Sequence, residues 1–114
     1  TLPGAVQLDF NQWFEPQSSK FVDTAKAKQI AAQISIPQGQ GAVAFCNTGH
    51  WAATDWFVLS EVLGQPDVKL YPGSMVEWSQ AATPLPMANE PGRLAQLRYQ
   101  LLGWSHRNLG TKAP

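Results

Sequence analysis

The stretch that decides the fold runs from Gly41 to Ala52 and reads GAVAFCNTGHWA. Its first part, Gly41 to Phe45, has the small and β-favouring side chains of a buried strand. The next segment, Ala52 to Leu63, is apolar on too many sides for a surface helix, so we expect a largely buried helix. The loop between them aims its backbone N–H groups inward, where the helix N-terminus adds a partial positive charge.

The only cysteine of the chain, Cys46, lies in this loop. Such a setting lowers the pKa of a thiol and binds an anion beside it, as a nucleophilic cysteine requires. Without such a setting, a lone cysteine is more often a small buried hydrophobe. One cysteine excludes an internal disulfide and a multi-thiolate zinc site. His50 and His106 are too few and too far apart for a metal site, so we expect neither a metal nor another cofactor.

Length and charge narrow the class of protein. At 114 residues and 12.5 kDa, the chain is long enough for one hydrophobic core and too short for two. Eight basic and eight acidic residues balance, so we expect no nucleic-acid partner and no membrane partner. The chain starts with Thr1 rather than methionine, so removal of a signal peptide, of a preceding domain or of part of a longer precursor is one expectation. The compartment is left open between the periplasm and the cytoplasm.

Helix and strand signals alternate along the chain without an internal repeat. A strand, a helix and a second strand in this order predict a parallel pair joined by a right-handed crossover. Gly64 is placed to end the middle helix in the left-handed conformation. The other expected elements are an extended piece over Ala5 to Leu8, a loop with a helical turn over Asp9 to Ser19, a helix over Ala25 to Ile34 capped by Asp23 or Thr24, and a strand over Val68 to Tyr71.

Four separated blocks then follow one another in a fixed order. They are the loop from Cys46 to Ala52, the helix ending at Gly64, the strand from Asp67 to Tyr71, and a Gly-x-x-x-x-Trp segment from Gly73 to Trp78. Together they resemble the second half of a rhodanese domain, and LPGAVQL at residues 2–8 resembles the segment that enters the second strand of that fold. The resemblance implies an α/β, rhodanese-like three-layer fold with a central parallel sheet flanked by helices.

Two features of the chain depart from the family at its ends. We expect residues 1–82 to form a rhodanese-like domain that lacks the family's usual first strand, so another segment, copy or chain would complete the sheet edge. Residues 83–114 are expected to form a Pro-rich linker and an additional C-terminal helix over Arg93 to Trp104. We expect that helix to pack on the domain through its helically spaced leucines, with partner binding as the alternative; the leucines are Leu94, Leu97, Leu101 and Leu102.

The loop itself departs from the family in its charge. Sulfurtransferases of this family often carry Arg or Lys just after the cysteine, whereas here Asn47, Thr48, His50 and Trp51 follow. Anion binding would then depend on the loop N–H groups, on the Asn47 and Thr48 side chains and on a protonated His50. Ala52 stands where related phosphatases carry a phosphate-clamping arginine, which argues against a cysteine phosphatase or arsenate reductase.

The resemblance implies a sulfurtransferase with Cys46 as its nucleophile. The thiolate would take a sulfur from a small anionic donor, thiosulfate or similar, and a thiol or cyanide-like acceptor would remove it from the persulfide. The substrate and anion-binding loop would consist of Asn47, Thr48, Gly49, His50, Trp51 and Ala52, with Gly49 allowing the tight turn, His50 at the rim and Trp51 as a pocket wall. The alternative is a rhodanese-fold binding or regulatory module, or half of a tandem rhodanese, without turnover of its own.

Overall fold

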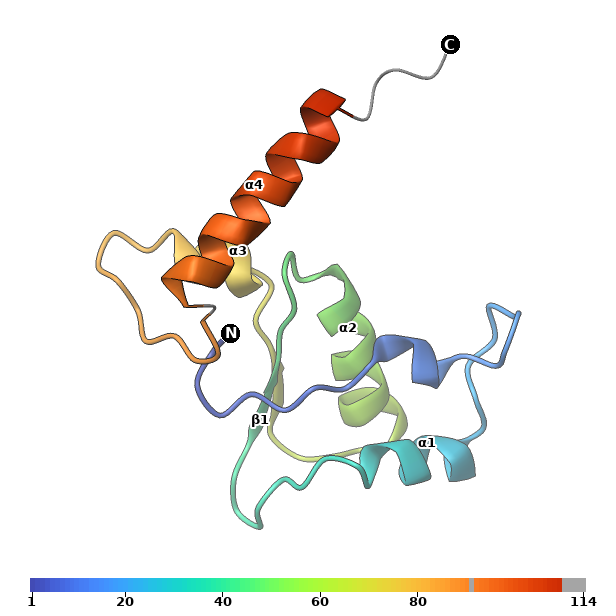
Figure 1. Cartoon of the computed structure of the whole chain (residues 1–114). Helices are drawn as coiled ribbons and strands as arrows, with labels where there is room; N and C mark the ends of the chain where they lie inside the picture. Colours follow the sequence, from blue (N-terminus) through green and yellow to red (C-terminus); the bar gives the residue numbers. More distant parts are fainter. Residues whose placement is uncertain (91, 110–114) are drawn as a thin grey trace.

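The computed structural model describes residues 1–90 and 92–109 of the chain (Figure 1). Helices outnumber strands in this part, and the strands are short. In chain order the elements are a 3-10 helix η1 (Phe10–Trp13), α1 (Thr24–Ala31), β1 (Ala42–Ala44), α2 (His50–Trp56), a π-helical continuation η2 (Phe57–Val62), β2 (Val68–Leu70), α3 (Ser74–Ser79) and α4 (Arg93–Leu109).

Strands β1 and β2 form a parallel pair, as the sequence predicted. Ala42 lies opposite Val68 and Ala44 lies opposite Leu70, and α2 with η2 connects the two strands. These are the only strands of a sheet in the described residues, and residues 5–8 join no ladder. The described part of the chain is therefore a small α/β unit, and a larger central sheet between two helical layers stays a prediction.

The crossover helix begins at His50, two residues before the expected start, and α2 passes into η2 at Phe57. Its end is as predicted, because Gly64 adopts the left-handed conformation at φ +66°. The expectation of a largely buried helix was wrong for the outward face, where Phe57 and Val62 are 42% and 44% exposed. The core packs against the other face, and although the Phe57 ring meets that of Phe21 with centroids 6.0 Å apart, both outer side chains remain partly at the surface.

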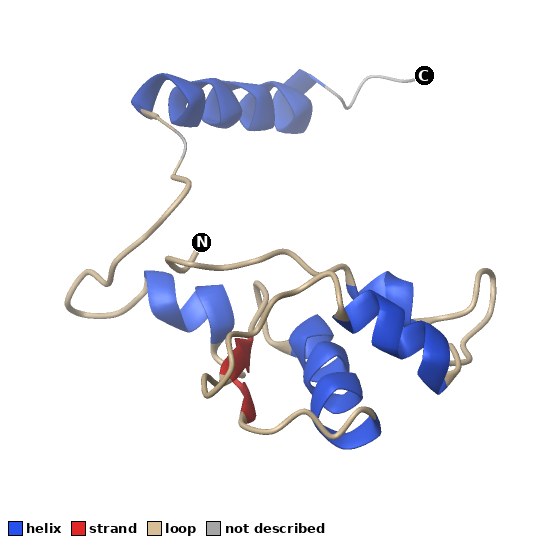
Figure 2. Ribbon diagram, turned by 90° about the horizontal axis from the view of Figure 1, so that it is seen from below, coloured by secondary structure: helices blue, strands red, loops and turns tan. Residues whose placement is uncertain are grey.

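The buried core residues come from η1, α1, η2 and β2, and the α2–η2 helix lies between the sheet on one side and α1 with η1 on the other (Figure 2). Trp13 is completely buried there, and its Nε1–H donates to Asp55 Oδ1 at 2.6 Å. Trp56 Nε1–H donates to the Val68 carbonyl at 3.1 Å and so joins α2 to β2. Helix α1 begins after Asp23, whose carboxylate accepts the Lys26 N–H as the expected N-cap. The two tryptophan hydrogen bonds therefore hold the C-terminal end of α2 beside η1 and β2.

The N-terminus of the chain meets the segment that precedes the last helix. The Thr1 amino group donates to the Ala88 carbonyl at 2.8 Å, and the Ala88 N–H donates to the Thr1 carbonyl. Beyond this point α4 extends away from the other elements (Figures 1 and 2). The four leucines expected to pack on the domain are exposed, and no such packing is seen among the described residues; Leu94, Leu97, Leu101 and Leu102 are 85%, 53%, 59% and 47% exposed.

Candidate active site

Cys46 lies two residues beyond the C-terminal end of β1, half-buried in the loop that leads into α2. The N–H of Gly49 donates to its Sγ at 3.0 Å. Gly49 is also the N-cap of α2, so the thiol lies against the first turn of that helix. The strand, loop and helix arrangement expected from the sequence is therefore present around the only thiol of the chain.

The backbone around Cys46 favours its thiolate. Burial raises the pKa of the Cys46 thiol, but hydrogen bonds from backbone N–H groups outweigh that effect and lower the pKa below its ordinary value. The four N–H donors belong to Ala52, Thr48, Gly49 and Trp51, all within the expected anion-binding loop. A ring of N–H donors around a thiolate also suits an anionic sulfur atom bound at the same place.

Gly49 is required by the backbone and by its surroundings. It adopts φ +88°, a left-handed conformation that is strained for any residue with a Cβ atom. A Cβ atom built on it would also collide with the carbonyl group of Pro72, which follows β2 by two residues. The tight turn that the sequence predicted at Gly49 thus brings the Cys46 loop against the chain that leaves β2.

The segment after β2 forms hydrogen bonds with the backbone of the cysteine loop. The Met75 N–H donates to the Cys46 carbonyl and the Val76 N–H to the Asn47 carbonyl, both at 3.0 Å. Ser74 is completely buried, and its Oγ accepts the Cys46 N–H at 3.0 Å. In the sequence, the Gly-x-x-x-x-Trp segment is a marker of the family, but it predicts no role for Ser74. The signal available in the sequence was a polar residue directly after a glycine, a few residues beyond a predicted strand.

The remaining loop side chains lie at the surface. Asn47, Thr48 and His50 are exposed, and Thr48 Oγ1 lies 3.2 Å from His50 Nδ1. Trp51 is 56% exposed and stacks on Phe10, with ring centroids 4.1 Å apart. The loop residues predicted from the sequence are thus together around Cys46, whereas the contribution of Phe10 through its stacking on Trp51 was missed.

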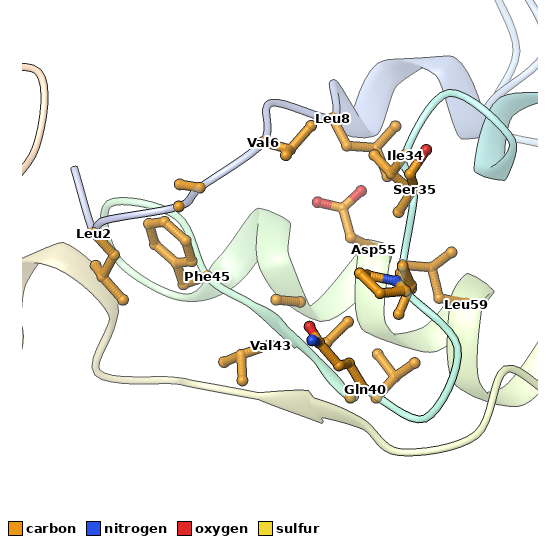
Figure 3. Close-up of a pocket in the computed structure, with 18 of the residues that line it drawn as sticks. Leu2, Val6, Leu8, Ile34, Ser35, Gln40, Val43, Phe45, Asp55 and Leu59 are labelled. Atoms are coloured by element: carbon orange, nitrogen blue, oxygen red, sulfur yellow. The ribbon is translucent and has the colours of Figure 1, made fainter.

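A cavity among the described residues lies near β1 but does not include Cys46. Its volume is about 470 Å³, and it lies between the N-terminal segment, residues 34–37 and β1. Figure 3 shows Asp55 among the mainly apolar side chains that line it. Burial raises the pKa of the Asp55 carboxyl, a nearby Asp9 adds to this, and the hydrogen bond from Trp13 opposes both. Phe45 lines this cavity, but the next residue, Cys46, does not. The cavity and the thiol are therefore separate features of the unit.

The described residues offer neither a metal-binding cluster nor a helix that could span a membrane. No group of three or more His, Cys, Asp or Glu side chains there could hold a metal ion. No helix in residues 1–90 and 92–109 combines the length and apolar character that crossing a bilayer requires.

A parallel strand pair, a crossover helix and a thiol held by backbone N–H groups at the helix start define an α/β unit with a candidate cysteine nucleophile. The model of the rhodanese-like domain family matches residues 1–81. The chain belongs to the rhodanese-like domain family, which confirms the resemblance seen in the sequence.

Curated relatives of the chain carry names from sulfur chemistry. The thiosulfate sulfurtransferase of Corynebacterium glutamicum is 34% identical over 77 residues, which cover 68% of this chain and 25% of that protein. The SseA protein of Mycobacterium tuberculosis is 32% identical over 92 residues, covering 80% and 30%. The sulfur carrier protein TtuD of Thermus thermophilus is 29% identical over 77 residues, covering 68% and 27%. The chain spans less than a third of the length of each of these relatives.

Proposed function

We propose that this chain is a sulfurtransferase that moves a sulfane sulfur from thiosulfate or a similar anionic donor to a thiophilic acceptor. The observation that carries the proposal is the position of the Cys46 thiol against the first turn of α2, where the Gly49 N–H donates to its Sγ at 3.0 Å. A nucleophilic cysteine must be ionised to attack, and this loop favours the ionised form. The relatives named as a thiosulfate sulfurtransferase and a sulfur carrier protein support this choice of chemistry.

The proposed reaction has two steps. In the first, the Cys46 thiolate attacks the outer sulfur of thiosulfate, a new S–S bond forms, and sulfite leaves with the electron pair of the bond that breaks. In the second, an acceptor thiolate or cyanide attacks the outer sulfur of the Cys46 persulfide. That sulfur departs on the acceptor, and the Cys46 thiolate is regenerated. No net oxidation or reduction of the enzyme takes place over the cycle.

The loop would stabilise both charged states of this cycle. The N–H groups of Thr48, Gly49, Trp51 and Ala52 that favour the thiolate would also favour the persulfide anion. No Lys or Arg stands among residues 47–52, so the donor would meet backbone dipoles and polar side chains rather than a fixed cation. We assign Asn47, Thr48 and His50 to the rim that the donor crosses and Trp51 to its wall.

Turnover with two donors tests the proposal. The full chain would be incubated with cyanide and either thiosulfate or 3-mercaptopyruvate, and thiocyanate formation would be followed. We expect activity with at least one donor and none for Cys46→Ser. The matched control is Cys46→Ser combined with Ser79→Cys, which moves the thiol to an exposed position outside the loop. Turnover by that control equal to wild type would show that the loop contributes nothing.

A second candidate function follows from the extent of the chain. The described sheet has two strands, and the chain covers less than a third of each relative. These facts fit a binding module or one half of a tandem rhodanese, in which another segment or chain completes the sheet. Thiocyanate formation by this chain alone would exclude a module without turnover. Absence of turnover, together with rapid alkylation of Cys46, would favour the half of a tandem protein.

A further inference from the structure

We infer that Ser74 is a positioning residue for the proposed sulfur transfer, because its hydroxyl holds the Cys46 loop against the C-terminal end of β2. The inference rests on the proposed function of Cys46 and names a residue that acts on it without touching the substrate. Ser74 lies 28 positions from Cys46 in sequence. It follows β2 and begins α3.

The Ser74 hydroxyl makes one hydrogen bond toward each strand end. Its Oγ accepts the Cys46 N–H at 3.0 Å and donates to the Tyr71 carbonyl at 2.9 Å. Cys46 follows β1 by two residues, and Tyr71 follows β2 directly. Ser74 is 0% exposed, so no bulk water competes for these two bonds. One buried hydroxyl therefore fixes the distance between the cysteine and the neighbouring strand end.

The backbone at Ser74 shows that its side chain has a particular use. Ser74 adopts φ +49°, in the left-handed region that glycine enters without strain and serine does not. The two hydrogen bonds of the hydroxyl compensate for that strain. A glycine would adopt this conformation without strain, but it could make neither bond. The next two N–H groups, of Met75 and Val76, bind the carbonyls of Cys46 and Asn47. The left-handed turn at Ser74 is what places this first turn of α3 beneath the loop.

These contacts bear on the chemistry through the geometry of the thiol. The N–H and the carbonyl of Cys46 both bind the segment 74–75, so the backbone of Cys46 is tied to the start of α3. The Sγ then stays within 3.0 Å of the Gly49 nitrogen. Removal of the Ser74 hydroxyl would leave the Cys46 N–H without its partner and let the loop rotate. The N–H groups around the thiol would lose their alignment, and the thiolate would be less favoured.

Alkylation of Cys46 as a function of pH tests the inference without requiring sulfur transfer. The variants are Ser74→Ala, Ser74→Gly and the control Ser79→Ala, which removes an exposed hydroxyl of the same helix. Iodoacetamide would be the probe on the full chain, with near-ultraviolet circular dichroism as the check of folding. We expect both Ser74 variants to react about 3- to 10-fold more slowly near neutral pH, the factor that one hydrogen bond corresponds to. At high pH, where every thiol is ionised, the rates should converge.

The two Ser74 variants separate the hydroxyl from the backbone. Ser74→Gly relieves the left-handed strain, so it folds even where Ser74→Ala is destabilised. If Ser74→Gly reacts like wild type at every pH, the hydroxyl has no positioning role and the inference is wrong. If wild type forms no persulfide with any donor, the proposed function fails instead, whatever the alkylation profiles show. A persulfide on wild type with unchanged profiles in the variants would overturn the Ser74 inference alone.

Discussion

At the scale of single residues, backbone N–H groups lower the pKa of the Cys46 thiol, and no charged side chain is among the causes. The N–H groups that lower its pKa come from four residues of one loop. Substituting a side chain leaves the backbone N–H in place. The loop can therefore favour the thiolate with Asn47, Thr48 and His50 at positions where related sulfurtransferases often carry Arg or Lys. The conformation of the loop then matters more than its side chains, and Gly49 and Ser74 set that conformation.

The pH dependence of Cys46 alkylation follows from the lowered pKa. The folded state favours the thiolate, so its stabilisation is present above the unfolded-state pKa and is lost as the pH falls through the folded-state pKa. We expect the midpoint of the alkylation rate to lie at lower pH in the folded chain than in the same chain in denaturant. Stopped-flow alkylation with a chromogenic reagent measures both. Coincident midpoints would show that the loop does not activate the thiol.

Gly49→Ala should be far more damaging than the same change at Gly39. Both glycines have positive φ, but a Cβ at Gly39 meets open space, whereas one at Gly49 meets the Pro72 carbonyl. We expect Gly39→Ala to lower the free energy of unfolding by about 1 kcal/mol and Gly49→Ala by about 2–4 kcal/mol. Urea denaturation of the two variants gives the difference. Equal losses would mean that the contact with Pro72 is not close.

Cys46 and Gly49 could be predicted from the sequence because their neighbours in the chain define the turn. Ser74 could not, since its role depends on a hydrogen bond to a residue 28 positions away. Sequence periodicity describes which face of an element is apolar, but it does not specify which hydroxyl of one loop meets which N–H of another. The stacking of Phe10 on Trp51 was missed for the same reason.

At the scale of elements, the order of strand, helix and strand was predicted and confirmed. The first and last residues of the elements were predicted less accurately. Apolar character predicted the helix after Cys46, but it could not show that the helix starts at His50 or turns π-helical at Phe57. Its burial was overestimated, because the sequence pattern implied neighbours on all sides. The core packs against one face, so Phe57 and Val62 stay partly exposed.

The hydrogen bond between Trp13 and Asp55 joins η1 to α2 and offers a test of element packing. Asp55→Asn keeps an acceptor oxygen, so we expect a change in the free energy of unfolding below about 1 kcal/mol near neutral pH. Asp55→Leu leaves the buried Trp13 N–H unpaired and should cost about 1–3 kcal/mol. Chemical denaturation of both variants measures these values. Equal effects of Asn and Leu would show that the hydrogen bond does not stabilise the packing.

The same pair has a defined pH dependence. Burial raises the folded-state pKa of Asp55, so its protonated form is favoured by folding. That contribution is fully present below the unfolded-state pKa and is lost as the pH rises through the folded-state pKa. Asp55→Asn should therefore gain stability relative to wild type over that rise in pH. Chemical denaturation of the two proteins over this pH range measures the gain, and a stability difference that stays constant with pH would contradict it.

At the scale of the whole molecule, a small α/β unit is followed by a helix that extends away from it. The Thr1 and Ala88 hydrogen bonds join the start of the chain to the segment before α4. The helix itself was predicted over Arg93 to Trp104 and is observed over Arg93–Leu109. Its packing on the domain could not be judged from an apolar stripe, because a stripe shows that a partner surface is favourable without showing which surface it is.

Substitution of the exposed leucines distinguishes an extended helix from a packed one. We expect Leu97→Ala and Leu101→Ala each to change the free energy of unfolding by less than about 0.5 kcal/mol, as surface substitutions do. The control Leu59→Ala, in the core and 5% exposed, should cost about 2–5 kcal/mol. Guanidinium denaturation compares them on one scale. Losses near the Leu59 value would show that α4 packs on the domain in solution, as the sequence predicted.

The central claim is that Cys46 carries a transferable sulfur in the loop of this chain. Intact-mass measurement after incubation with thiosulfate, and separately with 3-mercaptopyruvate, tests it most directly. We predict a gain of one sulfur, about 32 Da, on wild type and none on Cys46→Ser, with the added mass removed by cyanide. Wild type that gains no sulfur from either donor, while its thiol stays free to react with iodoacetamide, would contradict the claim.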